Sequence, residues 1–259
     1  MSEELLFEVK DGIGYATFNR PESRNALTFA MYERLVEITA EAERNPDIRA
    51  LVLTGAGEKA FAAGTDISQF RNFRTAQDAL DYEARIDGVL GALERCPVPT
   101  IAAIGGACTG GGAGIAASCD IRIGAANARF GFPIARTLGN CLSMSNYARL
   151  SGLIGAARTK EIIFTARLVE AEEARTIGLL SEVLPDRDAL LARATELAQL
   201  VASHAPLTLR ATKEALRRLR DQQLQGMDKD LILMCYLSAD FREGMEAFLN
   251  KRKPVWQGK

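Results

Sequence analysis

The chain has 259 residues, of which 47% are apolar and 25% are charged, a composition typical of folded globular proteins and not of disordered or fibrous ones. Its 32 basic and 33 acidic residues leave a net charge of −1, which gives no electrostatic basis for binding nucleic acid or a membrane surface. No apolar run reaches the roughly 18 residues of a membrane span, so the sequence also excludes a transmembrane protein.

The first part of the chain is predicted to form strands with helices between them. Residues 5–9 and 12–18 flank Asp11-Gly12, a dipeptide typical of the tight turn of a β-hairpin. Apolar spacing and β-branched content then predict a helix at 31–42, a buried strand (IRALVLT) at 48–54, a polar helix at 76–94 and a second buried strand (TIAAI) at 100–104.

A glycine-rich stretch follows at 105–114, and the chain becomes mostly helical beyond a third predicted strand at 120–124. The elements predicted beyond the glycine-rich stretch are a short helix at 115–119, a strand (DIRIG) at 120–124, an amphipathic helix at 190–201 and further helices at 207–220 and 228–249. No low-complexity linker or internal repeat divides the sequence. We therefore expect one α/β core with a helical C-terminal third.

The cysteines and the N-terminus indicate the compartment. The five cysteines form no CxxC pair and are odd in number, which predicts neither a zinc site nor a disulfide framework. The N-terminal segment MSEELLFEV has no basic, apolar or Arg/Ser-rich targeting pattern. These features predict a cytoplasmic protein without a metal.

Several common catalytic systems are excluded by the residues present. The sequence has a single histidine, His204, and no G-x-S-x-G motif to supply a nucleophilic serine. His204 is therefore expected to be structural or exposed. The sequence contains no GxxxxGK[ST] phosphate loop. A GxGxxA pattern at 112–117 lacks the acidic residue that a dinucleotide-binding fold needs about 20 positions later.

Two glycine-containing turns could act together. Gly110-Gly111-Gly112 precedes a predicted helix, and the segment 61–67 (FAAGTDI) also brings small residues before Asp66. One N–H from each turn could bind a carbonyl oxygen and stabilise an enolate or a tetrahedral oxyanion. The alternative is that both are tight structural turns, with Asp66 as a helix cap.

At these motifs the sequence resembles the crotonase (enoyl-CoA hydratase/isomerase) superfamily over nearly its whole length. Five segments carry the resemblance in the family's order and spacing: NRPESRNAL (19–27), LVLTGAGEKAFAAGTDI (51–67), PVPTIAAIGGACTGGGAGIAASCDIRI (97–123), ARFGFP (128–133) and FLNKRKPVW (248–256). The resemblance implies an α/β spiral of ββα units at 1–195 and a helical trimerisation region at 196–259. It further implies homotrimers, often paired as dimers of trimers, and an acyl-CoA substrate, with no cofactor besides the coenzyme A of that substrate.

Site residues follow from the resemblance by position. The oxyanion hole is expected to consist of the backbone N–H groups of Ala63 and Gly111. The positions expected to contact coenzyme A are Arg24, Ala26, Ala62, Asp66, Ile67, Phe248 and Lys251. The positions expected to line the acyl pocket are Gly114, Ile134, Gly139 and Cys141.

The chain departs from the family pattern at the two acid–base positions. Hydratases of the family carry glutamates there, which position water and exchange protons with the substrate. Here the positions are Gly114 and Ile134, which cannot transfer protons, and 121–160 contains no Asp or Glu. Where a dehalogenase branch has Gly-Asn-Asp, this chain has Cys141, which is either a reactive group or a small buried apolar residue.

Three classes of function remain open at this point. The chain is an enoyl-CoA hydratase, or an acyl-CoA decarboxylase, isomerase or hydrolase that uses the same oxyanion hole, or a non-catalytic CoA-binding homologue. Because both glutamates are missing, simple hydration is expected to be weak. The apolar residues of 227–249 (Leu231, Met234, Cys235, Leu237 and Phe241) are expected to be buried in a trimer, with packing inside one chain as the alternative.

Overall fold

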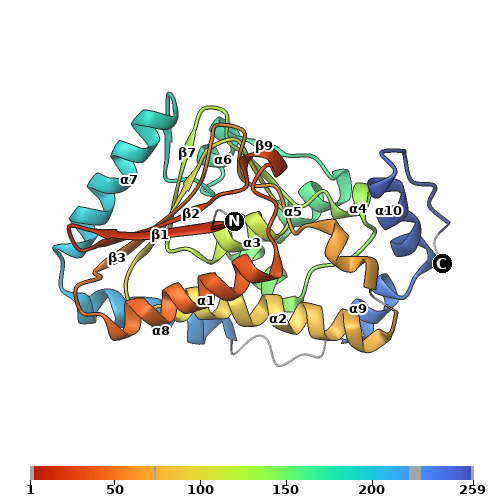
Figure 1. Ribbon diagram of the computed structural model, residues 1–259, viewed down its shortest axis with the longest axis horizontal. Coiled ribbons are helices and arrows are strands. Elements are labelled where there is room, and N and C mark those ends of the chain that lie inside the picture. Colours follow the sequence, from red (N-terminus) through yellow and green to blue (C-terminus); the bar gives the residue numbers. More distant parts are fainter. Residues whose placement is uncertain (1–2, 73, 222–228, 258–259) are drawn as a thin grey trace.

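Two sheets share the strands of the chain (Figure 1). The computed structural model describes residues 3–72, 74–221 and 229–257. The larger sheet contains, in spatial order, β1 (Leu5–Lys10), β2 (Ile13–Phe18), β3 (Ala50–Gly55), β5 (Thr100–Ile104), β7 (Ile121–Ala125) and β10 (Glu182–Leu184). The smaller sheet contains β4 (Ala60–Ala62), β6 (Ala107–Thr109), β8 (Arg129–Gly131) and β9 (Val169–Glu170).

The helices of the chain follow strand pairs or gather in its C-terminal part. They are α1 (Phe29–Arg44), α2 (Ala76–Arg95), α3 (Gly111–Ser118), α4 (Ile134–Thr137), α5 (Met144–Thr165), α6 (Ala171–Thr176), α7 (Arg187–Ala202), α8 (Pro206–Asp221), α9 (Lys229–Tyr236) and α10 (Ala239–Leu249). Two short 3₁₀ helices are η1 (Pro21–Ser23) and η2 (Ile67–Asn72). The pairs β3–β4, β5–β6 and β7–β8 each give one strand to either sheet and are each followed by a helix. This arrangement is the expected spiral of ββα units.

The predicted hairpin and buried strands are confirmed. β1 and β2 are antiparallel, and Asp11 and Gly12 between them have φ of 51° and 79°, as a tight hairpin turn requires. β3 and β5 are parallel and fully buried, because α7 covers one face of the sheet while α1, α2 and α3 lie against the other. Figure 1 shows α7 on one side of the sheet and α1 and α2 on the other.

A glycine allows α3 to pack directly against β4. The predicted short helix at 115–119 begins four residues earlier than expected, at Gly111, inside the glycine-rich stretch. A Cβ on Gly112 would overlap the carbonyl oxygen of Ala62 in β4. Only glycine permits this backbone contact, which joins two successive ββα units.

The C-terminal region differs from the sequence prediction in two ways. The expected boundary between 195 and 196 falls inside α7, where residues on either side of it (Ala194 and Leu197) pack on the sheet. The single helix predicted over 228–249 is wrong, since Ser238 interrupts it and caps α10 by accepting a hydrogen bond from the N–H of Phe241. The helical remainder therefore begins with α8.

The apolar residues of this region have different surroundings. Phe241 is buried within the chain, its ring centroid 4.7 Å from that of Tyr236, whereas Met234 and Leu237 are exposed. Met227 and the side chain of Leu231 lie outside the described residues. In the part of the chain that the structure covers, no helix is both long and apolar enough to cross a membrane.

Asn25 holds the loop that leads into α1. Its side chain is fully buried; Nδ2 donates to the carbonyls of Ala56 and Ala60, and Oδ1 accepts from the N–H of Arg20. Its φ of 54° is a left-handed conformation that asparagine tolerates better than most residues. One side chain thus satisfies three backbone groups from two segments.

Replacing Asn25 with alanine is expected to lower the free energy of unfolding by about 2–4 kcal/mol, because buried backbone groups lose their partners. Urea unfolding of the purified variant measures this loss. The matched control is Asn19→Ala, which removes one exposed hydrogen bond to the carbonyl of Glu3 and should cost less than about 1 kcal/mol. Equal losses in the two variants would contradict the assigned role of Asn25.

Candidate active site

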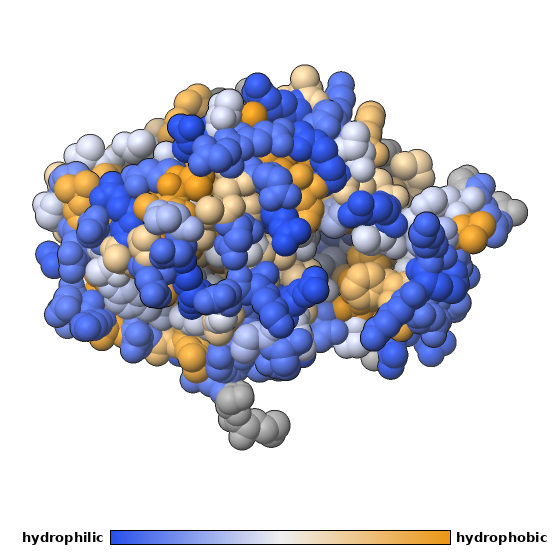
Figure 2. Space-filling model, turned by 90° about the horizontal axis from the view of Figure 1, so that it is seen from above, coloured by the Kyte–Doolittle hydropathy of each residue, from blue (hydrophilic) through white to orange (hydrophobic). Residues whose placement is uncertain are grey.

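A cavity of about 580 Å³ is lined by residues of β6 in the smaller sheet, of the helices α2, α3, α4 and α10, and of the loops beside them. Figure 2 shows the surface hollowed between the body of the molecule and the end that carries α10, with apolar residues beside the hollow. The residues of the two glycine-containing turns that line it are Ala63, Gly64, Thr65, Asp66, Ile67, Thr109, Gly110 and Gly111. The two turns that the sequence singled out thus meet at one cavity.

Hydrogen bonds on the first turn distinguish its N–H groups. The N–H of Ala63 donates to the carbonyl of Arg24 at 3.0 Å, so the group expected to bind an oxyanion is already engaged. The N–H of Asp66 donates to the carbonyl of Leu27 at 2.9 Å, in a bridge that pairs Leu27 with Thr65. Since successive N–H groups of extended chain point to opposite sides, that of Thr65 points away from Leu27. Nothing in the described ranges accepts a hydrogen bond from it.

The N–H group of interest on the second turn is that of Gly111. It is the first residue of α3, where backbone N–H groups have no acceptor within the helix. A Cβ on Gly111 would overlap the hydroxyl of Tyr32 and lie 3.1 Å from Oγ1 of Thr65. A Cβ on Gly110 would lie 3.4 Å from Cα of Gly64. The two turns are therefore in direct contact, with Thr65 and Gly111 facing the same space.

A row of hydroxyl groups supports Thr65. Its Oγ1 lies 2.9 Å from the hydroxyls of both Tyr32 and Tyr82. Burial raises the pKa of Tyr32 and of Tyr82 well above the usual value of tyrosine. Both phenols stay protonated, so they support the turn without adding charge. Sequence reasoning missed this row because its members are separated by 17 residues or more.

The two positions where the resemblance implies catalytic glutamates lie at this cavity. Gly114 and Ile134 both line it. A Cβ on Gly114 would lie 3.2 Å from Cδ1 of Leu90 and 3.6 Å from Oδ1 of Asn146. The space beside Gly114 therefore has an apolar side chain on one side and an amide on the other.

A carboxylate that sequence reasoning missed lines the cavity from α2. Glu83 is 5% exposed, and its Oε1 accepts a 2.5 Å hydrogen bond from the hydroxyl of Tyr236 on α9. The Tyr236 oxygen in turn accepts a hydrogen bond from Nδ2 of Asn140 at 3.2 Å. The signal in the sequence was the buried series Ala79, Glu83, Ile86, Leu90, at helical spacing.

Cys141 lines the same cavity but is not activated. A hydrogen bond with the thiol of Cys235, together with burial, raises the pKa of Cys141 far above its usual value. A protonated thiol is a weak nucleophile. Of the two roles considered for Cys141, the small, partly buried residue is the one this geometry favours.

The positions expected to bind coenzyme A and the acyl group are divided. Those that line the cavity are Arg24, Ala26, Asp66, Ile67 and Phe248 from the expected coenzyme A positions, and Gly114, Ile134 and Cys141 from the expected acyl-pocket positions. Ala62 is fully buried in β4 behind the cavity wall. Gly139 faces Trp256 and the backbone of Asp240, and Lys251 follows α10 on the surface. None of these last three residues lines the cavity.

Asp66 acts as the helix cap that the sequence suggested. Its Oδ1 accepts hydrogen bonds from the N–H and hydroxyl of Ser68 at the start of η2, and Oδ2 accepts from Arg20 at 3.1 Å. Burial alone would raise the pKa of Asp66, but these bonds outweigh it and hold the pKa below its usual value. The Asp66 carboxylate is therefore ionised, and its hydrogen bonds to Ser68 and Arg20 stabilise the loop.

Comparison with known proteins agrees with this architecture. The sequence model described as Enoyl-CoA hydratase/isomerase matches residues 8–259. The chain belongs to the enoyl-CoA hydratase/isomerase family.

Members of the family resemble the chain over its whole length. It is 35% identical to a short-chain-enoyl-CoA hydratase of Clostridium acetobutylicum, covering 96% of this chain and 95% of that protein. It is 36% identical to an (E)-benzylidenesuccinyl-CoA hydratase of Thauera aromatica, and the alignment covers 98% of this chain and 99% of that protein. The crystal structure of an enoyl-CoA hydratase/carnithine racemase from Magnetospirillum magneticum superposes on the chain with a TM-score of 0.80 at 33% sequence identity. The superposition covers 100% of this chain and 97% of that one.

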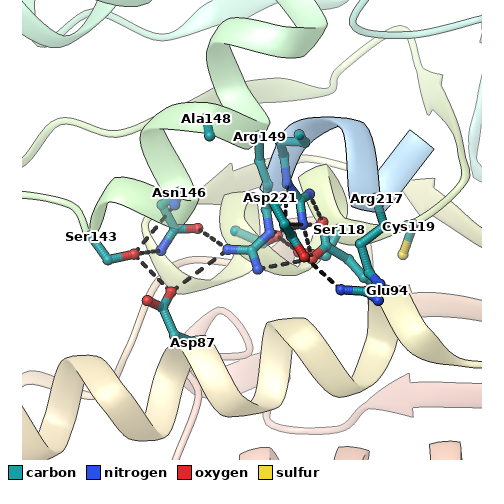
Figure 3. Close-up of polar contacts among 12 residues, drawn as sticks. Asp87, Glu94, Ser118, Cys119, Ser143, Asn146, Ala148, Arg149, Arg217 and Asp221 are labelled. Atoms are coloured by element: carbon teal, nitrogen blue, oxygen red, sulfur yellow. Dashed lines mark hydrogen bonds and ion pairs between the residues drawn. The ribbon is translucent and has the colours of Figure 1, made fainter. Parts of the chain in front are cut away.

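In this family member a buried arginine ties the cavity wall to the C-terminal helices (Figure 3). The Arg149 side chain on α5 is 4% exposed, and its Nη2 donates to Oε2 of Glu94 on α2 at 2.9 Å. Arg220 on α8 pairs with the same carboxylate. Arg149 also contacts Oδ1 of Asn146, at 3.4 Å. The cluster of Arg149, Glu94 and Arg220 joins α2, α5 and α8 and contacts Asn146, which lines the cavity.

Glu94 should make folding stability depend on pH. Burial alone would raise the pKa of Glu94, but hydrogen bonds from Arg220 and Arg149 hold it below the usual value of 4.5. A carboxyl whose folded-state pKa is lowered stabilises the fold above the unfolded-state pKa, and this stability is lost as the pH falls through the folded-state pKa.

At neutral pH Glu94→Gln is expected to unfold about 3–5 kcal/mol more easily than the parent, since the buried Arg149 loses the nearer of its two carboxylate partners, Glu94 and Asp87. Urea unfolding from about pH 6 to about pH 3 should show this gap narrowing, as the parent's Glu94 takes up a proton. Glu214→Gln removes a solvent-exposed carboxylate paired with Arg217 and Arg218, and should show a smaller gap. A gap that does not change with pH would refute the role given to Glu94.

Proposed function

We propose that the chain is an acyl-CoA enzyme that binds the thioester carbonyl between the N–H groups of Thr65 and Gly111. The observation that carries this proposal is the contact of the two turns at one cavity, where Gly111 faces the Thr65 side chain. The hydrogen bond from Ala63 to Arg24 supports Thr65, in place of Ala63, as the first donor.

These two donors stabilise an enolate. When the α-carbon of a thioester loses a proton, negative charge moves onto the carbonyl oxygen. Preorganised N–H groups stabilise that charge more than they stabilise the neutral ground state, and each such group typically contributes about 10²–10³ in rate. The coenzyme A part would lie along Arg24, Ala26 and Asp66, toward Phe248, with Lys251 available to its phosphates.

Hydration is the second candidate, and the names of the relatives favour it. The Clostridium acetobutylicum and Thauera aromatica proteins are both named hydratases. Against it stand Gly114 and Ile134, which cannot activate water. We propose that hydration of simple enoyl thioesters is weak, and that chemistry beginning from the enolate is the main activity.

Turnover of crotonyl-CoA by the parent protein should be slow, and the Gly114→Glu, Ile134→Glu double variant should hydrate it faster. Each restored acid–base group can contribute about 10²–10⁴ in rate. A Cβ at position 114 would lie 3.2 Å from a methyl group of the buried Leu90, which must shift by a few tenths of an ångström to admit a side chain. Loss of the enoyl thioester absorbance measures the rate.

Calorimetric titration with acetoacetyl-CoA is the control for each of these proteins, since a variant that no longer binds cannot report on chemistry. Saturable binding is expected in all of them. Rapid hydration by the parent would show that the missing glutamates do not limit it. Absence of binding at millimolar ligand would refute the acyl-CoA site itself.

We propose that the protein assembles through α8. This helix exposes Leu207, Leu216 and Leu219 at 78%, 63% and 60%, more apolar surface than an isolated helix face usually presents. A trimer, alone or paired, is the assembly that the family resemblance implies.

Sedimentation velocity at micromolar protein should therefore give a multiple of the 28.1 kDa chain. Leu216→Glu combined with Leu219→Glu should shift the protein toward monomer, because charges would be buried at the contact. Leu200→Glu, which changes an exposed leucine of α7, serves as the control. A monomeric parent would contradict the proposed assembly.

A further inference from the structure

We propose that Glu83 is the catalytic acid–base group that removes and returns the α-proton of an acyl-CoA bound in the cavity. This inference rests on the proposed function, because it requires the thioester carbonyl to lie between Thr65 and Gly111. It assigns to α2 the proton transfer that Gly114 and Ile134 cannot perform.

The position of Glu83 relative to the oxyanion donors supports this role. Gly111 faces Thr65, the Thr65 hydroxyl is bonded to Tyr82, and Glu83 is the next residue of α2. Thr65, Gly111 and Glu83 all line the same cavity. If a thioester carbonyl binds at the N–H groups of Thr65 and Gly111, its α-carbon lies in the cavity that Glu83 also lines.

Tyr236 positions the carboxylate. Its hydroxyl donates to Oε1 of Glu83 at 2.5 Å, and Asn140 in turn donates to the Tyr236 oxygen. Burial and the charge of Glu83 raise the pKa of Tyr236 well above its usual value, so the phenol remains a donor. A carboxylate that is 5% exposed and fixed by such a bond is preorganised for proton transfer.

The other ionisable groups of the cavity wall fit this role less well. Asp66 is the second carboxylate among the described residues that line it, and Ser68 and Arg20 hold it in its charged form. The thiol of Cys141 and the phenol of Tyr82 are held in their protonated forms. Arg24 bears a charge but no basic lone pair.

The proposed step conserves atoms and charge. A carboxylate oxygen of Glu83 takes the α-proton, and the electron pair of the broken C–H bond forms the C=C bond of the enolate. Negative charge passes from the carboxylate to the thioester oxygen, and the same proton can return to the α-carbon or, where the acyl chain has a β,γ double bond, to the γ-carbon of the dienolate. Nothing beyond the thioester is consumed.

The wall also indicates the class of acyl group. Around Glu83 the cavity is lined by apolar side chains, namely Ile86, Leu90, Ile134, Leu138 and Leu142. These residues favour an uncharged, aliphatic acyl chain over a carboxylated one. The substrate class that follows is an aliphatic acyl- or enoyl-CoA with an exchangeable α-proton.

Deuterium exchange at the α-carbon of butyryl-CoA in D₂O, followed by mass spectrometry, tests the inference. Glu83→Gln keeps an oxygen that can accept the Tyr236 hydrogen bond but cannot take up a proton. It should lower exchange by at least about 100-fold while leaving butyryl-CoA binding within about threefold by calorimetry. Tyr236→Phe keeps the carboxylate and should lower exchange by a smaller factor, about tenfold.

Asp81→Asn is the matched control, because it neutralises an exposed carboxylate on the same helix and should leave exchange unchanged. Exchange by Glu83→Gln within about threefold of the parent would overturn the role of Glu83 while leaving the proposed function standing. A parent protein that binds butyryl-CoA without exchanging its α-proton would overturn it too. Failure of the parent to bind would refute the proposed function instead. If Glu83→Gln does not fold, exchange by Tyr236→Phe equal to that of the parent overturns the inference.

Discussion

The candidate site depends on the close approach of two backbone turns. The turn at Gly64-Thr65 and the turn at Gly110-Gly111 belong to successive ββα units, and glycine at positions 64, 110 and 111 lets the two backbones come close. A side chain at position 112 would push α3 away from β4, and one at position 111 would displace the Tyr32 hydroxyl that supports Thr65. The spacing of the two N–H groups is therefore set by the packing of the core.

Backbone donors and side-chain acids impose different constraints on a protein of this fold. The donors require particular turn geometry, which any sequence with glycine at a few positions can retain. The acid requires only that a carboxylate reach the reacting carbon, and several elements border the cavity. Under the proposed function, the chain can keep Gly111 without an acid at Gly114 or Ile134, because Glu83 lines the same cavity from α2.

Most of the fold could be predicted from the sequence, because its main strands and helices have strong local patterns. The hairpin and the strands β3 and β5 follow from turn chemistry and buried β-branched runs. The break at Ser238 was missed because apolar spacing continues across it, whereas a capping hydrogen bond decides where a helix begins. Similarly, α3 begins within the glycine stretch because packing against Ala62 outweighs poor helix propensity.

The site was predictable where it consists of contiguous motifs and not where it is assembled from distant residues. Both turns were found, but Thr65 could be distinguished from Ala63 only by the bond from Ala63 to Arg24. Glu83 could not be recognised from the glycine motifs, because it lies on α2, outside the segment 121–160 that follows them. Its partner Tyr236 lies 153 residues further along the chain, a contact that no local pattern encodes.

The cluster around Arg149 has a mechanical consequence. Glu83 and Glu94 lie on the same uninterrupted helix, so their separation along its axis is fixed at about 16 Å by the helical rise. Glu94 is anchored to α5 and α8, while Glu83 faces the cavity. A displacement of α8 would therefore be transmitted along α2 as a shift of the Glu83 carboxylate relative to the two N–H groups.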